Sequence, residues 1–188
     1  RAFDCFGNYN DCMVSVQVND KIGVVNASCP PSQRISCNWY QDNLEAALTA
    51  AAGDDAQQDN ILTPHFGTPT FLDNCSFDVL PSVTINLDQC GEGSIVRSWT
   101  AADPSGNQPA SCTQTIFVDH VSDWVVSFPP HLEFDCMDLL PDFGEPQIFY
   151  GDCEMIAVSY EDEIFNAVPD ACYKIVRKYT VINWCVVG

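Results

Sequence analysis

Short runs of alternating hydrophobic and polar residues dominate this chain. Residues 14–18 read Val-Ser-Val-Gln-Val, and residues 113–118 follow the same alternation in outline. Further runs rich in β-branched and aromatic residues occupy 82–87, 94–100, 155–160 and 173–181. Clusters of Asp, Asn, Gly and Pro separate the runs, and residues 103–107 form a turn between two of them. This pattern predicts an all-β chain of antiparallel sandwiches of the immunoglobulin type.

One stretch departs from the β pattern. It begins at Asp42, consists largely of alanine and leucine, and ends at Gly53. Asp42 and the acidic residue three positions later form a capping box at the start of a helix. Alanine has a high helix propensity, and Gly53 can adopt the left-handed backbone conformation that ends a helix. We therefore predict one short inserted helix over about 43–52. Its leucines, Leu44 and Leu48, give a narrow apolar seam that packs on the sandwich.

The chain also matches itself, and the spacing between matched segments falls by about 20 residues after Cys37, where the first copy carries the helical insert. Segments recur in the same order: 29–31 at 128–130, Cys37 at Cys136, 66–69 at 143–146, 73–75 at 151–153 and 95–100 at 175–180. So many ordered matches are hard to obtain by chance, and they predict tandem copies of one small fold. We expect a complete repeat with the helical insert over 21–119 and a second repeat over 120–188.

The two ends of the chain are related in this scheme. Residues 1–20 end in a stretch that matches residues 112–119, the last strand of the first repeat, whereas the second repeat stops short of that strand. We expect Val14, Val16 and Val18 to complete the second repeat of a neighbouring copy by strand complementation. The alternative is a window on a longer polypeptide, in which the preceding and following repeats supply both edges.

The eleven cysteines indicate disulfides formed outside the cell. No Cys-x-x-Cys pair is present, and the three histidines are too scattered for a metal centre. Comparison of the repeats predicts these pairs: Cys29–Cys112, Cys75–Cys90, Cys153–Cys172 and Cys136–Cys185. Cys37 is then left unpaired, while Cys5 and Cys12 pair with each other or with a preceding unit.

The charge balance excludes several partners. Seven basic against 26 acidic residues give a net charge of −19, which repels phosphate backbones and anionic lipids. No run approaches the roughly 20 apolar residues of a membrane span. We expect no nucleic-acid partner and no membrane span in this segment.

Three stretches resemble a known family. Cys29-Pro30-Pro31, the Trp99-Thr100-x-x-Asp103 stretch with Gly106-Asn107, and residues 112–119 are similar to the hyalin-related, immunoglobulin-like repeats of very large Bacteroidota surface proteins, such as the gliding-motility adhesin SprB. Ser105 and Phe128 stand where that family usually has cysteine. The resemblance implies a segment of a long cell-surface filament, exported by the type IX route and serving adhesion or gliding motility.

We therefore expect a structural segment rather than an enzyme, with no cofactor and with other repeats or copies of itself, head to tail, as partners. Paired acids such as Asp54-Asp55 lie in turn-like contexts and not in a shared cleft, which argues against glycosidase chemistry. The competing class is a carbohydrate- or ligand-binding module for surface glycans. Trp39-Tyr40 and Trp124 would stack on sugars there, although core packing is the default for such residues.

Calcium is the one metal that the acidic residues suggest. The weak candidates lie near the unit junctions and in the adjacent turn: Asp20, Asp103, Asp119 and Asp123. Carboxylates are the hard oxygen ligands that Ca²⁺ prefers, but no EF-hand spacing is present. Solvated turn residues are the competing interpretation.

Overall fold

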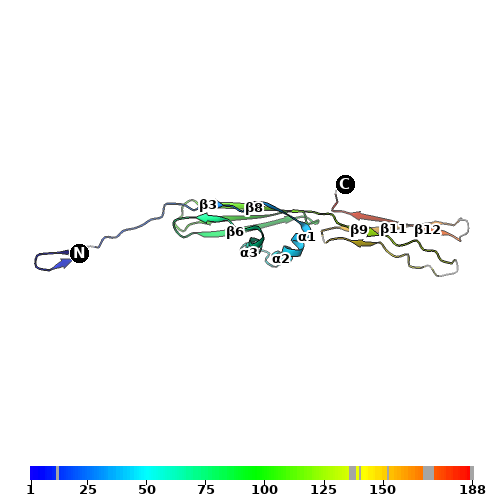
Figure 1. The fold of residues 1–188 in the computed structure, drawn as a ribbon, viewed down its shortest axis with the longest axis horizontal. Helices are drawn as coiled ribbons and strands as arrows, with labels where there is room; N and C mark the ends of the chain where they lie inside the picture. Colours follow the sequence, from blue (N-terminus) through cyan, green and yellow to red (C-terminus); the bar gives the residue numbers. More distant parts are fainter. Residues whose placement is uncertain (12, 136–138, 140, 152, 167–171, 187–188) are drawn as a thin grey trace.

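The computed structural model describes residues 1–11, 13–135, 139, 141–151, 153–166 and 172–186. The molecule is mostly β and elongated (Figure 1). A small hairpin of β1 (Ala2–Phe3) and β2 (Tyr9–Asn10) lies at one end of the molecule. An extended segment connects this hairpin to the part of the chain over residues 21–119, here called the first unit. The described residues from 120 onward follow it and are called the second unit. Within the described residues, no helix has the length and apolar character needed to cross a membrane.

The first unit is built on a four-stranded sheet in the order β4-β8-β7-β6. These strands span Gln33–Ser36, Ala110–Asp119, Gly93–Ala102 and Asp78–Leu87, and they contain the predicted runs at 82–87, 94–100 and 113–118. A second layer pairs β3 (Val25–Ser28) with β5 (Thr70–Leu72). The prediction of wholly antiparallel sheets is wrong, because β4 and β8 pair in parallel. The chain passes from β3 into β4 without a hairpin, so β4 can take the direction of β8.

The helical insert is larger than predicted. A continuous helical stretch runs through α1 (Cys37–Tyr40), the π-helix η1 (Gln41–Glu45) and α2 (Ala46–Ala50). The predicted start near residue 43 is wrong, because Ser36 caps this stretch by accepting a hydrogen bond from the Trp39 N–H at 3.2 Å.

A second helix, α3 (Asp55–Phe66), follows after Gly53 and was not predicted. Its first half is polar, and only Gln58, Leu62 and Phe66 are buried, so the sequence shows no continuous apolar stripe. The Asp54 side chain caps its start by accepting from the Gln57 N–H at 3.0 Å.

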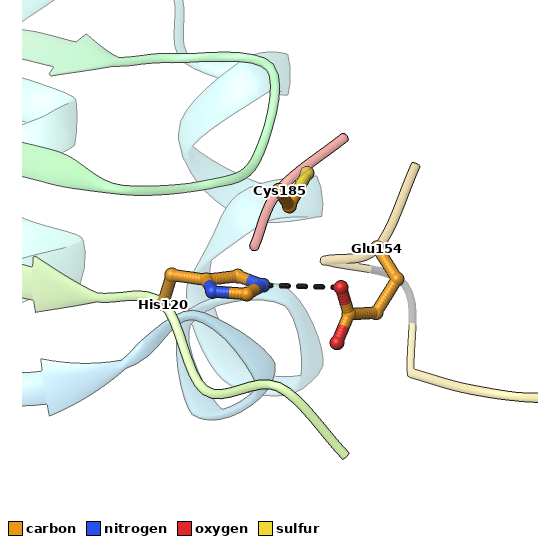
Figure 2. A group of neighbouring side chains, drawn as sticks. All are labelled: His120, Glu154 and Cys185. Carbon is orange, nitrogen blue, oxygen red and sulfur yellow. Dashed lines mark hydrogen bonds and ion pairs between the residues drawn. The ribbon is translucent and has the colours of Figure 1, made fainter. Parts of the chain in front are cut away.

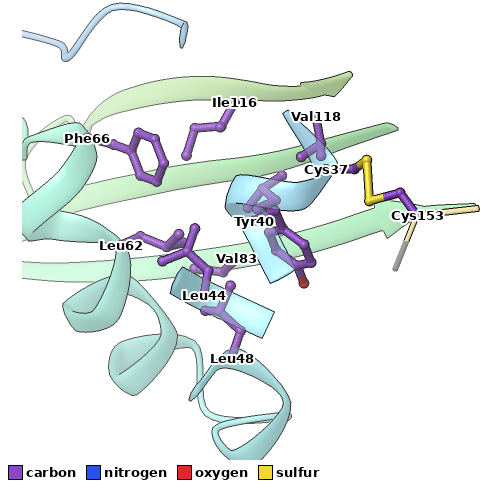
Figure 3. Close-up of a cluster of buried hydrophobic side chains, with 11 residues drawn as sticks. Cys37, Tyr40, Leu44, Leu48, Leu62, Phe66, Val83, Ile116, Val118 and Cys153 are labelled. Carbon is purple, nitrogen blue, oxygen red and sulfur yellow. A yellow bond between two sulfur atoms is a disulfide. The ribbon is translucent and has the colours of Figure 1, made fainter. Parts of the chain in front are cut away.

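The core of the first unit has two parts, one under the helices and one under the small sheet. Figure 3 shows the helical part, where Leu44, Leu48, Leu62 and Phe66 pack against Val83, Ile116 and Val118 of the large sheet. The other part gathers Val24, Phe71, Trp99, Ala101 and Cys112 beneath β3 and β5. The helices therefore cover the end of the sheet that the second layer leaves open, and each large buried side chain contributes roughly 1.5–3 kcal/mol.

A buried arginine ties α3 to the sheet. Arg97 on β7 is fully buried, and its guanidinium donates to Asp59 Oδ1 at 2.9 Å and to Thr63 Oγ1 at 2.8 Å. It also donates to Gln114 Oε1 on β8 at 2.8 Å. Burial lowers the pKa of Arg97, while the Asp59 carboxylate acts in the opposite direction. An arginine remains charged under these conditions, so the pair with Asp59 is a buried ion pair.

The second unit consists of two hairpin-like sheets. β9 (Val125–Ser127) pairs with β10 (Gln147–Phe149), and β11 (Ile156–Phe165) pairs with β12 (Lys174–Asn183). The predicted runs at 155–160 and 173–181 lie in β11 and β12. The residues described in this unit form no helix.

The predicted strand at 14–18 is extended but makes no sheet pairing in the described chain. Its valines are largely exposed to solvent: Val14 by 78%, Val16 by 76% and Val18 by 89%.

Candidate functional site

Two disulfides cross the junction between the units. Cys37, at the start of α1, is bonded to Cys153 of the second unit, with their Cα atoms 6.2 Å apart. Cys90, in the turn between β6 and β7, is bonded to Cys185, which follows β12, at a Cα separation of 5.4 Å. The two units are therefore covalently clamped at two points besides the connecting chain.

The structure joins Cys29 to Cys112, as predicted, within the first unit. The remaining pairings are wrong: Cys37 is not unpaired, Cys153 and Cys185 are bonded across the junction, and Cys75 is free and exposed. The comparison of the repeats assigns each unit its own bridges, whereas the fold brings cysteines of consecutive units together. Cys5 is also free and exposed, and Cys172 is disulfide-bonded. Cys12 and Cys136 lie outside the described residues.

The β6–β7 turn packs directly on one of these bridges. The Asp88 side chain accepts from the N–H groups of Cys90 and Glu92 at 2.9 and 3.0 Å. Gly91 has φ +71°, and a Cβ on it would lie 3.1 Å from Cys37 Cβ. Glycine is required at this position for both its backbone conformation and the close approach.

A buried glutamate forms the polar centre of the junction. Figure 2 shows Glu154 facing His120, the residue after β8, beside Cys185. Its side chain is fully buried and accepts from His120 Nε2 at 3.2 Å, Asn183 Nδ2 at 2.6 Å and the Asp123 N–H at 3.2 Å. Burial raises the pKa of the Glu154 carboxyl, but hydrogen bonds, including one from Ser122, hold it below its ordinary value. The Cys185 sulfur is bonded to Cys90, so this cluster offers no thiolate to a metal.

Two of the predicted calcium candidates are engaged in other contacts at this junction. Asp119 forms a two-pronged ion pair with Arg34 on the neighbouring β4. Asp123 accepts from Asn38 Nδ2 of α1 at 3.2 Å and from the Gly151 N–H at 3.3 Å. Asp123 thus links the two units, whereas Asp119 is paired within the first unit, and the two do not gather into a common cation site.

The other two candidates do come together. Ligand oxygens of Asp20 and Asp103 lie with one of Asp73 within 4.8 Å of one another, at the end of the first unit that faces the N-terminal segment. Asp73 was missed as a candidate, because in the sequence it is only one member of a repeated segment. Partial desolvation and these three carboxylates raise the pKa of the neighbouring Cys75 thiol.

The second feature that the sequence predicts is an open strand edge. β12 pairs with β11, and no other described strand pairs with β12. A groove of about 890 Å³ runs beside its inward face and is lined by residues 129–135, 172–177, Phe143 and Tyr179. The aromatic residues proposed for sugar stacking do not line this groove. Tyr40 is buried, Trp124 is half-buried, and the half-buried Trp39 packs edge-on to Phe66 with ring centroids 6.0 Å apart.

No protein-family model matches this chain. No curated protein and no solved structure shows significant similarity to it.

Proposed function

We propose that the chain is a structural segment of an extracellular, cell-surface filament or adhesin, built from tandem immunoglobulin-like units that are completed by strand complementation. The observation that carries this proposal is the unpaired edge of β12, together with the unpaired strand-like segment 13–19. The disulfides Cys29–Cys112, Cys37–Cys153 and Cys90–Cys185 support an extracellular setting. Adhesion and gliding motility are the contexts that the resemblance to hyalin-related repeats suggests.

Equivalent glycines support the view that the two units are copies of one fold. Gly67 and Gly144 both have positive φ, at +83° and +71°, and both are close to a proline, Pro30 and Pro129 respectively. Each carbonyl accepts a bond from the second long strand: Gly67 O from Arg97, and Gly144 O from the Tyr179 hydroxyl at 2.8 Å. The glycines thus share a backbone conformation and a proline contact. The donors to their carbonyls come from positions two residues apart in the repeat, because Tyr179 matches Trp99 and not Arg97.

The difference between the units lies in what covers the inward face of that strand. On β7, between two neighbouring strands, Ile95 and Trp99 are fully buried. On β12 the matching residues, Ile175 and Tyr179, are only half-buried. A two-stranded sheet is marginally stable in water by itself, so a third strand on β12 would bury apolar surface and pair backbone groups.

Residues 13–19 fit that position. In β8 the alternate residues Gln114, Ile116 and Val118 are buried, and the sequence match places Val14, Val16 and Val18 at these positions. The register of β7 with β8 then sets Val14 opposite Arg177 and Val16 opposite Ile175.

A valine opposite Arg177 does not remove the acceptor that this arginine uses. In the first unit the buried Arg97 uses Gln114 as an acceptor. Arg177 instead donates twice to Asp162 on β11, both at 2.8 Å, and lies over the Tyr160 ring. The second unit therefore needs an apolar rather than a polar residue at the Gln114 position.

The donor segment and the open edge lie at opposite ends of the molecule, with the first unit between them (Figure 1). One chain cannot fill its own edge, so pairing joins successive units head to tail. The donor is then a second copy, or the following repeat of a longer polypeptide.

The test compares two variants of the full chain that add the same charge. Val16→Asp places a carboxylate in the groove, whereas Gln17→Asp places it at the outward position matching the exposed Phe117. Light scattering and electron microscopy should show concentration-dependent fibres for the wild type and Gln17→Asp, and single particles for Val16→Asp. Equal assembly of both variants would contradict the proposal.

A synthetic peptide of residues 12–20 separates the two possible donors. If the wild-type chain stays monomeric yet binds this peptide, and not its Val16→Asp form, the strand comes from a flanking repeat. If the monomeric chain binds neither peptide, strand complementation is wrong.

A further inference from the structure

We propose that Asp20, Asp73 and Asp103 form a Ca²⁺ site that fixes the N-terminal strand segment to the first unit. Asp20 ends the exposed segment 13–19, Asp73 follows β5, and Asp103 follows β7. A cation held by all three would join the strand segment to both layers of the first unit. This inference does not depend on strand complementation, since the site lies within one chain.

Each of the three carboxylates has one buried oxygen without a hydrogen-bond partner. The Oδ2 atoms of Asp20, Asp73 and Asp103 are all buried and accept no hydrogen bond. Asp103 is only 7% exposed, so its orphan oxygen is out of reach of bulk solvent. A buried carboxylate oxygen without a partner costs free energy, and three at one point also repel each other.

The other oxygens are occupied in a way that fixes the geometry. Asp103 Oδ1 accepts from the Ser105 N–H at 2.6 Å, and Asp73 Oδ1 accepts from the Asn74 N–H at 2.7 Å. Asp20 Oδ1 accepts from the Ile22 N–H at 3.2 Å. Asp20 Oδ1 also accepts from Asn74 Nδ2 at 3.3 Å. The Oδ1 atoms are thus held by protein donors, which leaves the Oδ2 atoms free for a ligand.

No protein cation neutralises the cluster in the part of the chain that the structure describes. The ion pairs there use Asp11, Asp59, Asp119, Asp162, Glu133 and Glu154. The adjacent Lys21 is exposed and forms none of them. Three negative charges therefore remain to be balanced from outside the chain.

At the junction between the two units, protein side chains donate hydrogen bonds to the buried carboxylate. By the sequence matches, His120 takes the place of Asp20, and Asn183 takes the place of Asp103. Asn183 Oδ1 accepts from the Cys185 N–H at 3.0 Å, just as Asp103 Oδ1 accepts from the Ser105 N–H. There His120 and Asn183 donate to one carboxylate, that of Glu154. At the Asp20, Asp73 and Asp103 cluster, by contrast, the three Oδ2 atoms receive no such side-chain donors.

The donor set favours calcium among the common divalent ions. All the free atoms are carboxylate oxygens, which are hard ligands. Ca²⁺ accepts flexible arrangements of such oxygens at about 2.3–2.6 Å, and ligand oxygens of the three aspartates lie within 4.8 Å of one another. Mg²⁺ requires a tighter octahedron, with ligands at about 2.1 Å.

The experiment is a calorimetric Ca²⁺ titration of the full chain in 150 mM salt, repeated with Mg²⁺. We expect one saturable Ca²⁺ site in the range of extracellular modules, about 0.1–1 mM, and at least tenfold weaker binding of Mg²⁺. Asp103→Asn should weaken Ca²⁺ binding at least tenfold. Asp42→Asn removes the same charge from an exposed position on η1 and should leave the affinity within twofold.

Asp20→Asn is a second test variant in case Asp103→Asn fails to fold, because Asp20 lies outside the sheets of the first unit. It should weaken binding to a similar degree with an unchanged circular dichroism spectrum. Bound Ca²⁺ should also slow proteolysis within residues 13–20 severalfold in the wild type but not in Asp20→Asn. No saturable site, equal loss in Asp42→Asn, or equal binding of Mg²⁺ would overturn the assignment.

Discussion

Cys37 and Cys153 are joined by a disulfide although 116 residues separate them in the chain. Cys37 opens the helical insert of the first unit, and Cys153 precedes the first long strand of the second unit. The Gly91 turn packs against this bridge, and the Cys90–Cys185 bridge lies at the same junction. The junction is thus a packed, cross-linked interface rather than a flexible linker.

Removing the Cys37–Cys153 bridge should loosen the two units. We expect the Cys37→Ala/Cys153→Ala double variant to lose about 2–5 kcal/mol of unfolding free energy, since the bridge closes a long loop of the unfolded chain. Guanidinium unfolding followed by tryptophan fluorescence measures this change. Cys5→Ala/Cys75→Ala is the matched control, because both thiols are free and exposed, and it should change stability by less than about 0.5 kcal/mol. Equal effects of the two double variants would show that the bridge does not stabilise the fold.

The buried Glu154 should make stability depend on pH in the acid range. Its pKa is lower in the folded chain than its ordinary value of 4.5, so its stabilising effect is complete above that value. The effect is lost as the pH falls through the folded-state pKa. Unfolding free energies measured from pH 6 to pH 3 should therefore fall less steeply for Glu154→Gln than for the wild type.

Glu154→Gln should also cost roughly 1–3 kcal/mol at pH 7, because its amide presents a donor toward His120 or Asn183. Glu133→Gln is the control, since Glu133 is exposed and its contact with His131 is 3.7 Å long. Identical pH profiles for wild type and Glu154→Gln would contradict a role for this carboxylate.

The Arg97–Asp59 pair should be worth far more than an exposed pair of the same type. Asp59→Asn leaves a buried guanidinium without its carboxylate, and we expect a loss of about 3–5 kcal/mol in unfolding free energy. Asp119→Asn breaks the exposed pair with Arg34 and should cost less than about 1 kcal/mol. If the two losses were similar, the anchoring of α3 would rest on its apolar contacts and not on Arg97.

Some features of the candidate sites followed from local patterns. Runs of β-branched and aromatic residues, bounded by turn residues, predicted the long strands β6, β7, β8, β11 and β12. Such a local pattern is sufficient to indicate a strand. The Cys29–Cys112 pair followed from the matching of first and last strands. Asp20 and Asp103 were recognised as possible ligands, but Asp73 became visible only when β5 and β7 brought it beside them.

The sequence by itself determined the β-rich character, the repeated segments and the strand-like alternation of residues 14–18, since these depend on composition and local periodicity. The tertiary structure alone decided which cysteines meet, that two helices replace part of the second layer, and which acids converge. Those outcomes depend on contacts between residues far apart in the chain. Local patterns carry no information about which distant surfaces bury the most area together, and that burial selects the pairs.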